Sequence, residues 1–141
     1  MGRGVAGAGW PSASPPPAWD GLQWRLSDVT ELPRVREELR RHTAAQGPVE
    51  LRDRLLLVLD EMASNALRHG GGRVEACVRR TGDAFLVAVS DGDPRTPPTP
   101  AVDRDPSEGG LGLHLIAELS TAHGWYVEGD AKTVWAVLPR R

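Results

Sequence analysis

One helix constrains the fold of this chain more than any other segment, because its centre is apolar on every side. The helix is predicted from about Pro48 to Arg68, and the run Leu55–Leu59 within it contains no polar residue. A helix at the surface of a domain has a single apolar stripe, so this helix should be buried on more than one face. Proline suits its first turn, and Gly70–Gly72 ends it.

Two polar residues lie near the end of this buried helix. Glu61 and Asn65 are four positions apart, so their side chains stand on the same face, one helical turn from each other. The amide oxygen of Asn65 is a suitable ligand for a hard cation such as Mg²⁺, and the Glu61 carboxylate can orient or deprotonate a nucleophile. The spacing alone equally fits a solvated helix face. Polar groups at a buried helix end, however, need partners.

Periodicity and turn residues predict the remaining elements. Apolar residues recur at helical spacing in two further segments and alternate in the predicted strands. Ser27 or Asp28 can cap the helix that follows. These elements are a short strand at 24–26, helices at about 30–45 and 109–121, a hairpin of strands at 74–78 and 84–90, and strands at 125–128 and 133–138. Their order predicts an α+β fold, a two-layer α/β sandwich in which three helices cover one face of a mixed, largely antiparallel sheet.

The chain is long enough for one domain, which we expect at residues 21–141, after a tail at 1–20. Residues 1–18 are mostly Gly, Ala, Ser and Pro, a composition that predicts disorder. Trp10 and Trp19 could anchor a partner or belong to a loose tail. Residues 91–108 contain five prolines and almost nothing to bury, and a loop of this length is typical of a lid, a binding loop or a disordered segment.

Charge and hydropathy set limits on the function. The net charge of −2 gives no reason to expect direct binding to nucleic acid. No apolar stretch is long enough to cross a membrane, and the N-terminus lacks the apolar region of a secretory signal. We therefore expect a cytoplasmic protein. The single cysteine, Cys77, lies in a predicted strand, where a packed small side chain is the simpler interpretation than a functional thiol.

Three more segments bear on the pair in the buried helix. Asp91-Gly92-Asp93 follows a buried strand, so its first acid can accept a hydrogen bond from an amino group, although the same residues also form plain turns. Gly109–Gly112 begins a helix, and free N–H groups there attract phosphate. Lys132-Thr133 begins the final strand, where the hydroxyl could bond to a ligand or occupy a turn.

Taken in this order, these motifs resemble the GHKL or Bergerat-fold ATP-binding domain. The motifs are Glu61-xxx-Asn65, Asp91-x-Asp93, a proline-rich lid, Gly110-Leu111-Gly112 and Lys132-Thr133. The likeness covers about residues 22–139. It is closest to the small anti-sigma-factor serine/threonine kinases of partner-switching systems, as the strings Asn-Ala-Leu-Arg-His-Gly and Lys-Thr-Val-Trp are typical of their actinobacterial members.

The resemblance implies a role for each matching residue. Asn65 would bind a Mg²⁺ ion that bridges the phosphates of ATP, and Glu61 would be the general base or position the acceptor hydroxyl. Asp91 would accept the adenine amino group, and Thr133 would support it through water. Asp93 belongs to the same nucleotide-binding box.

For the phosphates, the resemblance implies that Gly110 and Gly112, with Leu111 between them, let backbone amides hold the ligand while the loop from Asp93 to Glu108 closes as a lid. Pro94 and Arg95 depart from the family pattern, in which further glycines follow Asp93. The roles of Arg68 and His69, next to the predicted phosphate site, stay open between a charge contact and a structural one.

The resemblance therefore implies a Mg²⁺- and ATP-dependent serine/threonine protein kinase. Its substrate would be a small anti-anti-sigma-like antagonist, and its other partner could be a sigma factor; a homodimer is also expected from the family. A non-catalytic module that switches partners with nucleotide is the alternative, favoured by the altered region after Asp91. A scaffold that has lost ATP is a weaker alternative, because Asn65, Asp91 and the glycines are intact.

Overall fold

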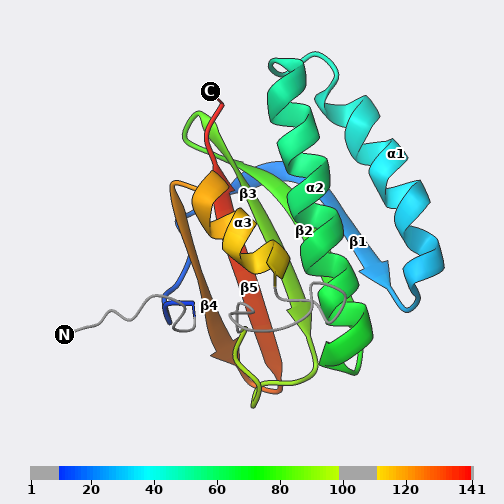
Figure 1. Cartoon of the computed structure of the whole chain (residues 1–141), viewed down its shortest axis with the longest axis vertical. Coiled ribbons are helices and arrows are strands. Elements are labelled where there is room, and N and C mark those ends of the chain that lie inside the picture. The colour runs from blue at the N-terminus through cyan, green and yellow to red at the C-terminus, as the bar shows by residue number, and fades with distance from the viewer. Residues whose placement is uncertain (1–9, 99–110, 141) are drawn as a thin grey trace.

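A single five-stranded sheet organises the molecule (Figure 1). The computed structural model describes residues 10–98 and 111–140, and of Leu111 only the backbone. The strands are β1 (Trp19–Leu26), β2 (Val74–Thr81), β3 (Ala84–Asp91), β4 (Ala122–Glu128) and β5 (Ala131–Leu138). The helices are α1 (Leu32–Thr43), α2 (Val49–Asn65) and α3 (Leu111–Leu119), with a 3₁₀ turn at Val29–Glu31 and a π-helical turn at Ala66–Gly70.

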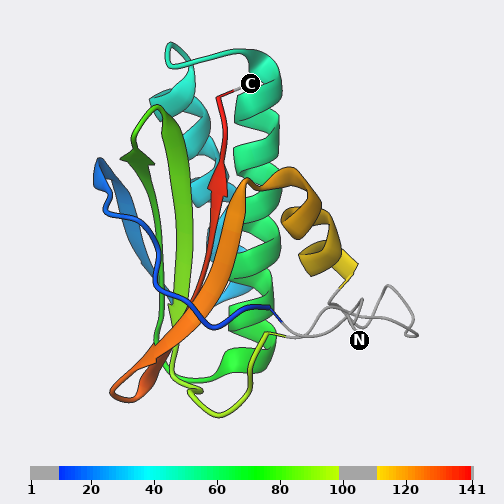
Figure 2. The ribbon, with the colours of Figure 1, turned by 90° about the vertical axis from the view of Figure 1, so that its left-hand side faces the viewer.

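The strand order is β1-β2-β3-β5-β4, and every neighbouring pair is antiparallel. The three helices lie on one face of this sheet, as Figures 1 and 2 show. The predicted two-layer α+β fold is therefore confirmed. The sheet is more regular than the mixed one we expected, since parallel pairing among the described residues is confined to an isolated bridge between Ser12 and Trp125.

Helix α2 lies at the centre of the helical layer, with α1 on one side and α3 on the other. Its buried residues cover more than a single stripe, as the apolar run predicted. They are Leu51, Leu55, Val58, Leu59, Met62 and Ala63. Alternate residues of the strands pack against them, among them Val78 and Val87, both almost fully buried. The core therefore holds α2 in a fixed position over the sheet.

The start of the helical layer is fixed by a capping box around Asp28. The Asp28 carboxylate accepts a hydrogen bond from the Thr30 N–H, and the Glu31 carboxylate accepts bonds from the N–H groups of Ser27 and Asp28. These backbone hydrogen bonds hold the pKa of Glu31 below its ordinary value. The predicted cap at Ser27 or Asp28 is thus resolved in favour of Asp28, which satisfies N–H groups that helix geometry leaves free.

Residues 10–18, which we expected to be disordered, pack along the sheet. Trp10 is 5% exposed and joins the main core, where its ring lies 4.8 Å from that of His123. The Trp125 indole N–H donates to the Trp10 carbonyl, and the Trp135 indole N–H donates to the Ala13 carbonyl. The composition of this segment predicted disorder because it lacks aliphatic residues, but its tryptophan supplies the missing apolar area. Residues 1–9, the rest of that predicted tail, lie outside the described residues.

Beyond Trp10 the segment passes around the outer strand β4 onto the face of the sheet opposite the helices. A second apolar cluster lies on that face and consists of Leu86, Trp135 and Val137, with Ala18 and Tyr126 against it. The Thr81 hydroxyl also donates to the Pro17 carbonyl. Residues 10–18 therefore cover part of a face that would otherwise be open. Among the described helices, none is long and apolar enough to cross a membrane.

The contacts of Trp10 predict a measurable role in stability. Trp10→Ala should lower the free energy of unfolding by about 3 kcal/mol, as large-to-small changes of buried aromatic residues do. Trp19→Ala is the matched control, because Trp19 is 47% exposed and its replacement should cost little. Urea denaturation followed by circular dichroism measures both. Equal midpoints for the two variants would contradict the anchoring role of Trp10.

Candidate functional site

The site forms where α2 ends. Glu61 and Asn65 lie one turn apart on its last turns, and at Ala66 the chain passes into the π-helical turn. The Oδ1 atom of Asn65 is buried and, among the described residues, has no hydrogen-bond partner. A buried carbonyl oxygen without a partner costs about 1–3 kcal/mol. Such an atom is explained when it serves a ligand, and π-helical turns are frequent at functional sites.

The start of α3 packs directly against Glu61. A Cβ atom added at Gly112 would lie 2.2 Å from the Glu61 Cγ and 2.6 Å from its Oε2. No residue with a side chain fits there without moving Glu61. The requirement for glycine at this position is therefore steric, and it brings the backbone of the α3 N-terminus beside the carboxylate. Free N–H groups at a helix N-terminus suit phosphate oxygens.

Asp91 ends β3 and is buried beside a lysine. Its Oδ1 accepts a hydrogen bond of 2.9 Å from the Asp93 N–H, and the Lys132 Nζ lies 3.5 Å from its Oδ2. The two side chains are only 6% and 9% exposed. Burial raises the pKa of the Asp91 carboxyl, against the opposing effects of the Asp93 N–H and the Lys132 charge. The positive charge of Lys132 therefore offsets part of the free-energy cost of burying the Asp91 carboxylate.

The glycine loop, Gly70–Gly72, follows the π-helical end of α2 and contacts the end of β3. A Cβ atom at Gly70 would lie 2.5 Å from the Asp91 Cγ, and the Gly92 N–H donates to the Gly71 carbonyl at 2.8 Å. Gly71 has a φ of +91°, a conformation that disfavours other residues. This contact places Asn65 and Asp91 at the same end of the domain, on the helical side of the sheet.

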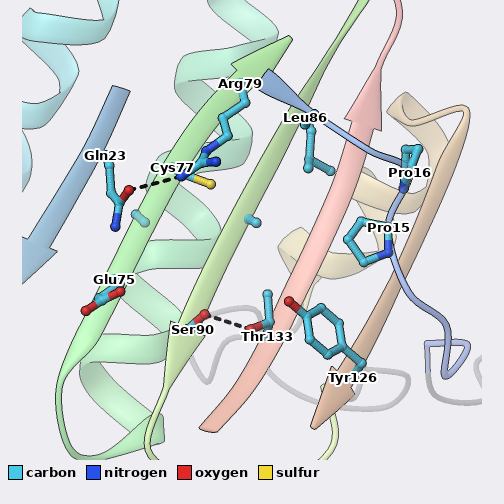
Figure 3. Close-up of a pocket in the computed structure, with 13 residues that line it drawn as sticks. Pro15, Pro16, Gln23, Glu75, Cys77, Arg79, Leu86, Ser90, Tyr126 and Thr133 are labelled. Atoms are coloured by element: carbon cyan, nitrogen blue, oxygen red, sulfur yellow. Dashed lines mark hydrogen bonds between the residues drawn. The ribbon is translucent and has the colours of Figure 1, made fainter. Parts of the chain in front are cut away.

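Thr133 lies on the other side of the sheet, so its expected role beside Asp91 is wrong. Its hydroxyl is 2.7 Å from that of Ser90, and both point to the face opposite the helices, near Tyr126 (Figure 3). Successive side chains of a strand point to opposite faces. The residue that faces Asp91 is consequently the preceding one, Lys132.

Asp93 shapes the loop that follows β3. Its Oδ1 accepts a hydrogen bond from the Arg95 N–H, and a hydrogen bond from the Thr96 side chain is the main cause that holds its pKa below the ordinary value. The carboxylate is therefore engaged by its own loop. The Arg68 guanidinium bonds to Ser64 on the preceding turn, which favours a structural role for that residue. His69 lies on the same π-helical turn and is exposed.

Part of the predicted phosphate site and lid cannot be placed. Gly110 and residues 99–109 lie outside the described residues, and Leu111 is placed only as the first residue of α3. Gly112 is therefore the one member of the Gly110-Leu111-Gly112 motif whose surroundings are described.

A separate depression of about 340 Å³ lies on the opposite face of the sheet (Figure 3). Pro15, Pro16, Gln23, Cys77 and Tyr126 are among its lining residues. Burial raises the pKa of the Cys77 thiol, which keeps it protonated and poorly nucleophilic. The depression thus lies on the face away from Asp91 and Lys132, and the interpretation of Cys77 as a packed side chain is the better one.

Comparison with known proteins decides the family. The family model for the histidine kinase-like ATPase domain matches residues 26–138. The chain belongs to this family. The histidine kinase-like ATPase domain thus includes the end of α2, the glycine loop and the end of β3 described above.

Two known proteins are similar to this chain. Over 85 residues the chain is 38% identical to the alginate biosynthesis sensor protein KinB of Pseudomonas aeruginosa, a match that covers 51% of this chain and 14% of KinB. The crystal structure of the RsbU and RsbW domains of a Mycobacterium tuberculosis protein matches with a TM-score of 0.59 and 15% identity. That match covers 84% of this chain and 32% of the other, and it supports the fold.

Sequence patterns assign no role in the site to Gly70, which they explain as part of the glycine run that ends a helix. Of the Lys132-Thr133 pair, they assign a role to Thr133 alone. The alternation of β5 offered a usable signal: Ala136 and Leu138 are core positions, and counting back in steps of two puts Lys132 on the helical face. Nothing comparable in the sequence identifies the contact between Gly70 and Asp91.

The steric contact at Gly70 predicts an effect on nucleotide binding. Gly70→Ala should weaken ATP binding by about tenfold or more, because the added Cβ displaces the Asp91 carboxylate. Gly82→Ala is the control, since Gly82 lies in the distant β2–β3 turn at a φ of +62° with open space around it. Isothermal titration calorimetry measures both affinities. The steric account fails if the two variants bind ATP equally well.

Proposed function

We propose that this protein binds ATP at the end of α2 and β3 and transfers its γ-phosphoryl group to a serine or threonine of a small antagonist protein. The proposal rests above all on the buried, unpartnered Oδ1 of Asn65, one turn from Glu61. Phosphoryl transfer needs positioning and charge neutralisation more than covalent chemistry, so a small number of residues is sufficient.

Each residue has a role that fits its surroundings. Asn65 would bind Mg²⁺, which when present supplies positive charge to the phosphates; an amide oxygen is a hard ligand of the kind that this ion prefers. Because Mg²⁺ sites at nucleotides take much of their coordination from phosphate and water, a single protein ligand is sufficient.

Glu61 and Asp91 would act at opposite ends of the nucleotide. The Glu61 carboxylate, against the backbone of Gly112, would accept the proton of the attacking hydroxyl or orient that hydroxyl. Asp91 would accept a hydrogen bond from the base, with its carboxylate held by the Asp93 N–H. Residues at the N-terminus of α3 would bind phosphate oxygens through backbone N–H groups.

The proposed partners follow from the kinds of protein that this chain resembles. The motif pattern resembles that of anti-sigma-factor kinases, and a structure containing an RsbW domain shares the fold. The antagonist would be an anti-anti-sigma-like protein, and a sigma factor would be the regulated partner. The alternative is a non-catalytic module that changes partners with nucleotide. The altered region after Asp91, where the Asp93 carboxylate is bonded to Arg95 and Thr96 of its own loop, favours this alternative.

The ATP site has a direct test in Asn65→Ala. The variant should lose about tenfold or more in affinity for ATP in the presence of Mg²⁺, because the amide oxygen that would bind the ion is removed. The difference between parent and variant should shrink when EDTA replaces Mg²⁺. Asp53→Ala, at an exposed position on the same helix, is the control. Calorimetric titration of both variants with and without the ion provides the measurement. Parental affinity in Asn65→Ala would overturn this assignment.

The kinase activity has a separate test in Glu61→Gln. This variant should bind ATP as the parent does. Its rate of phosphate transfer to a candidate antagonist should fall by about 100-fold or more, the usual loss for a missing general base. Transfer of ³²P from labelled ATP to purified antagonist candidates measures the rate. Equal transfer by parent and variant would contradict the role of Glu61. Intact ATP binding without any transfer by the parent would instead favour the non-catalytic module.

A further inference from the structure

A buried ammonium group lies at the end of the site that would hold the base. Lys132 is the only lysine of the chain, in which the other 16 of 17 basic residues are arginines. Its Nζ donates a hydrogen bond of 2.6 Å to the Thr96 carbonyl and lies 3.5 Å from the Asp91 Oδ2. An ammonium carries three N–H donors. Thr96 and Asp91 account for two of them among the described residues, so a third is available to a ligand bound against Asp91.

Adenine differs from the 6-oxopurines, guanine and hypoxanthine, in the groups that the Asp91–Lys132 pair would meet. Adenine has an amino group at position 6, whereas guanine and hypoxanthine have a carbonyl oxygen there. The 6-oxopurines also carry an N–H at position 1, beside that oxygen. A carboxylate alone can accept a hydrogen bond from an N–H group of the base, but it cannot donate one to the oxygen at position 6. With an ammonium beside it, the carboxylate can accept a hydrogen bond from the N–H at position 1 while the ammonium donates one to the oxygen at position 6.

We propose that Lys132 contacts the base and allows the site to bind 6-oxopurine nucleotides such as GTP and ITP in addition to ATP. This inference rests on the proposed nucleotide-binding function and adds a specificity-determining residue to it. The Asp91 carboxylate binds the N–H at position 1, and the Lys132 ammonium binds the oxygen at position 6. The guanine 2-amino group, a further donor, lies on the side of the carboxylate.

The burial of Asp91 and Lys132 explains why the difference between adenine and the 6-oxopurines should affect the affinity. Both side chains are over 90% buried, so neither is freely rehydrated when a ligand excludes water. A buried donor without a good acceptor is penalised far more than an exposed one. An adenine held by Asp91 through its amino group leaves only the ring nitrogen at position 1 for Lys132. A 6-oxopurine offers the ammonium a carbonyl oxygen, which is the better acceptor.

The test is the affinity ratio between nucleotides, measured on the full chain in Mg²⁺ by isothermal titration calorimetry. The parent should bind GTP and ITP within about tenfold of ATP. Lys132→Thr and Lys132→Met should each weaken GTP and ITP by about tenfold more than they weaken ATP, because a good polar contact to a base typically discriminates by this much. Circular dichroism establishes that both variants are folded.

The lone lysine also provides a spectroscopic readout. In protein labelled with ¹³C at lysine Cε, a single side-chain signal reports on Lys132. GTP and ITP should shift this signal more than ATP does, with the same concentration dependence as the calorimetric titration.

Three outcomes would overturn the inference. GTP could fail to bind the parent at concentrations at which ATP saturates it. The two variants could weaken ATP and GTP by the same factor. Finally, Lys132→Thr could tighten ATP without any GTP binding, which would make the lysine an occluding group. In each of these cases ATP still binds, so the proposed function survives. If neither nucleotide binds the parent or either variant, the proposed function fails as well, and the two failures are thereby distinguished.

Discussion

The contact between the glycine loop and the end of β3 holds the site together. Gly70 lies so close to the Asp91 carboxylate that a methyl group would not fit, and the Gly92 N–H is bonded to the Gly71 carbonyl. Helix α2 is held by the core on several sides, so this loop determines where its polar end meets the sheet. Because both flanking elements are rigid, Asn65 and Asp91 are positioned before any ligand arrives, which lowers the cost of ordering on binding.

The opposite face of the sheet shows how a small domain covers apolar strands without a second helical layer. Leu86, Trp135 and Val137 form a cluster there, and residues 10–18 lie against part of it. The segment is held at one end by Trp10 in the main core and along its length by bonds from indole and hydroxyl groups. Its prolines lack N–H groups, so few backbone donors remain to be satisfied on a sheet face that offers few acceptors.

Sequence patterns correctly predicted those helices and strands that are determined by residues close together in the chain. The buried character of α2 followed from its apolar run, and the helix start near Asp28 from capping chemistry. The errors concern contacts between distant segments. Composition could not reveal that Trp10 has a place in the core, because its contacts are with His123 and Trp125 of β4, which are distant in the sequence. The family motif led to Thr133, whereas the pleat of β5 turns the neighbouring residue toward Asp91. A shift of one residue changes the face of the sheet, so a motif matched one position off selects the wrong side chain.

The choice of lysine at position 132 is difficult to explain by stability. Replacing a buried ion pair with well-packed apolar side chains is often neutral or stabilising, and Val89, the preceding residue of β3 on the same face as Asp91, is already apolar and buried. Arginine supplies every other basic residue in this chain, so the exception calls for a property that arginine lacks. The compact ammonium is such a property: it fits between the Asp91 carboxylate and the Thr96 carbonyl, where the broad, planar guanidinium would need more room. Those two acceptors hold the charge in place but leave one of its donors directed elsewhere. A buried cation retained under these conditions is better understood as a binding group than as part of the core.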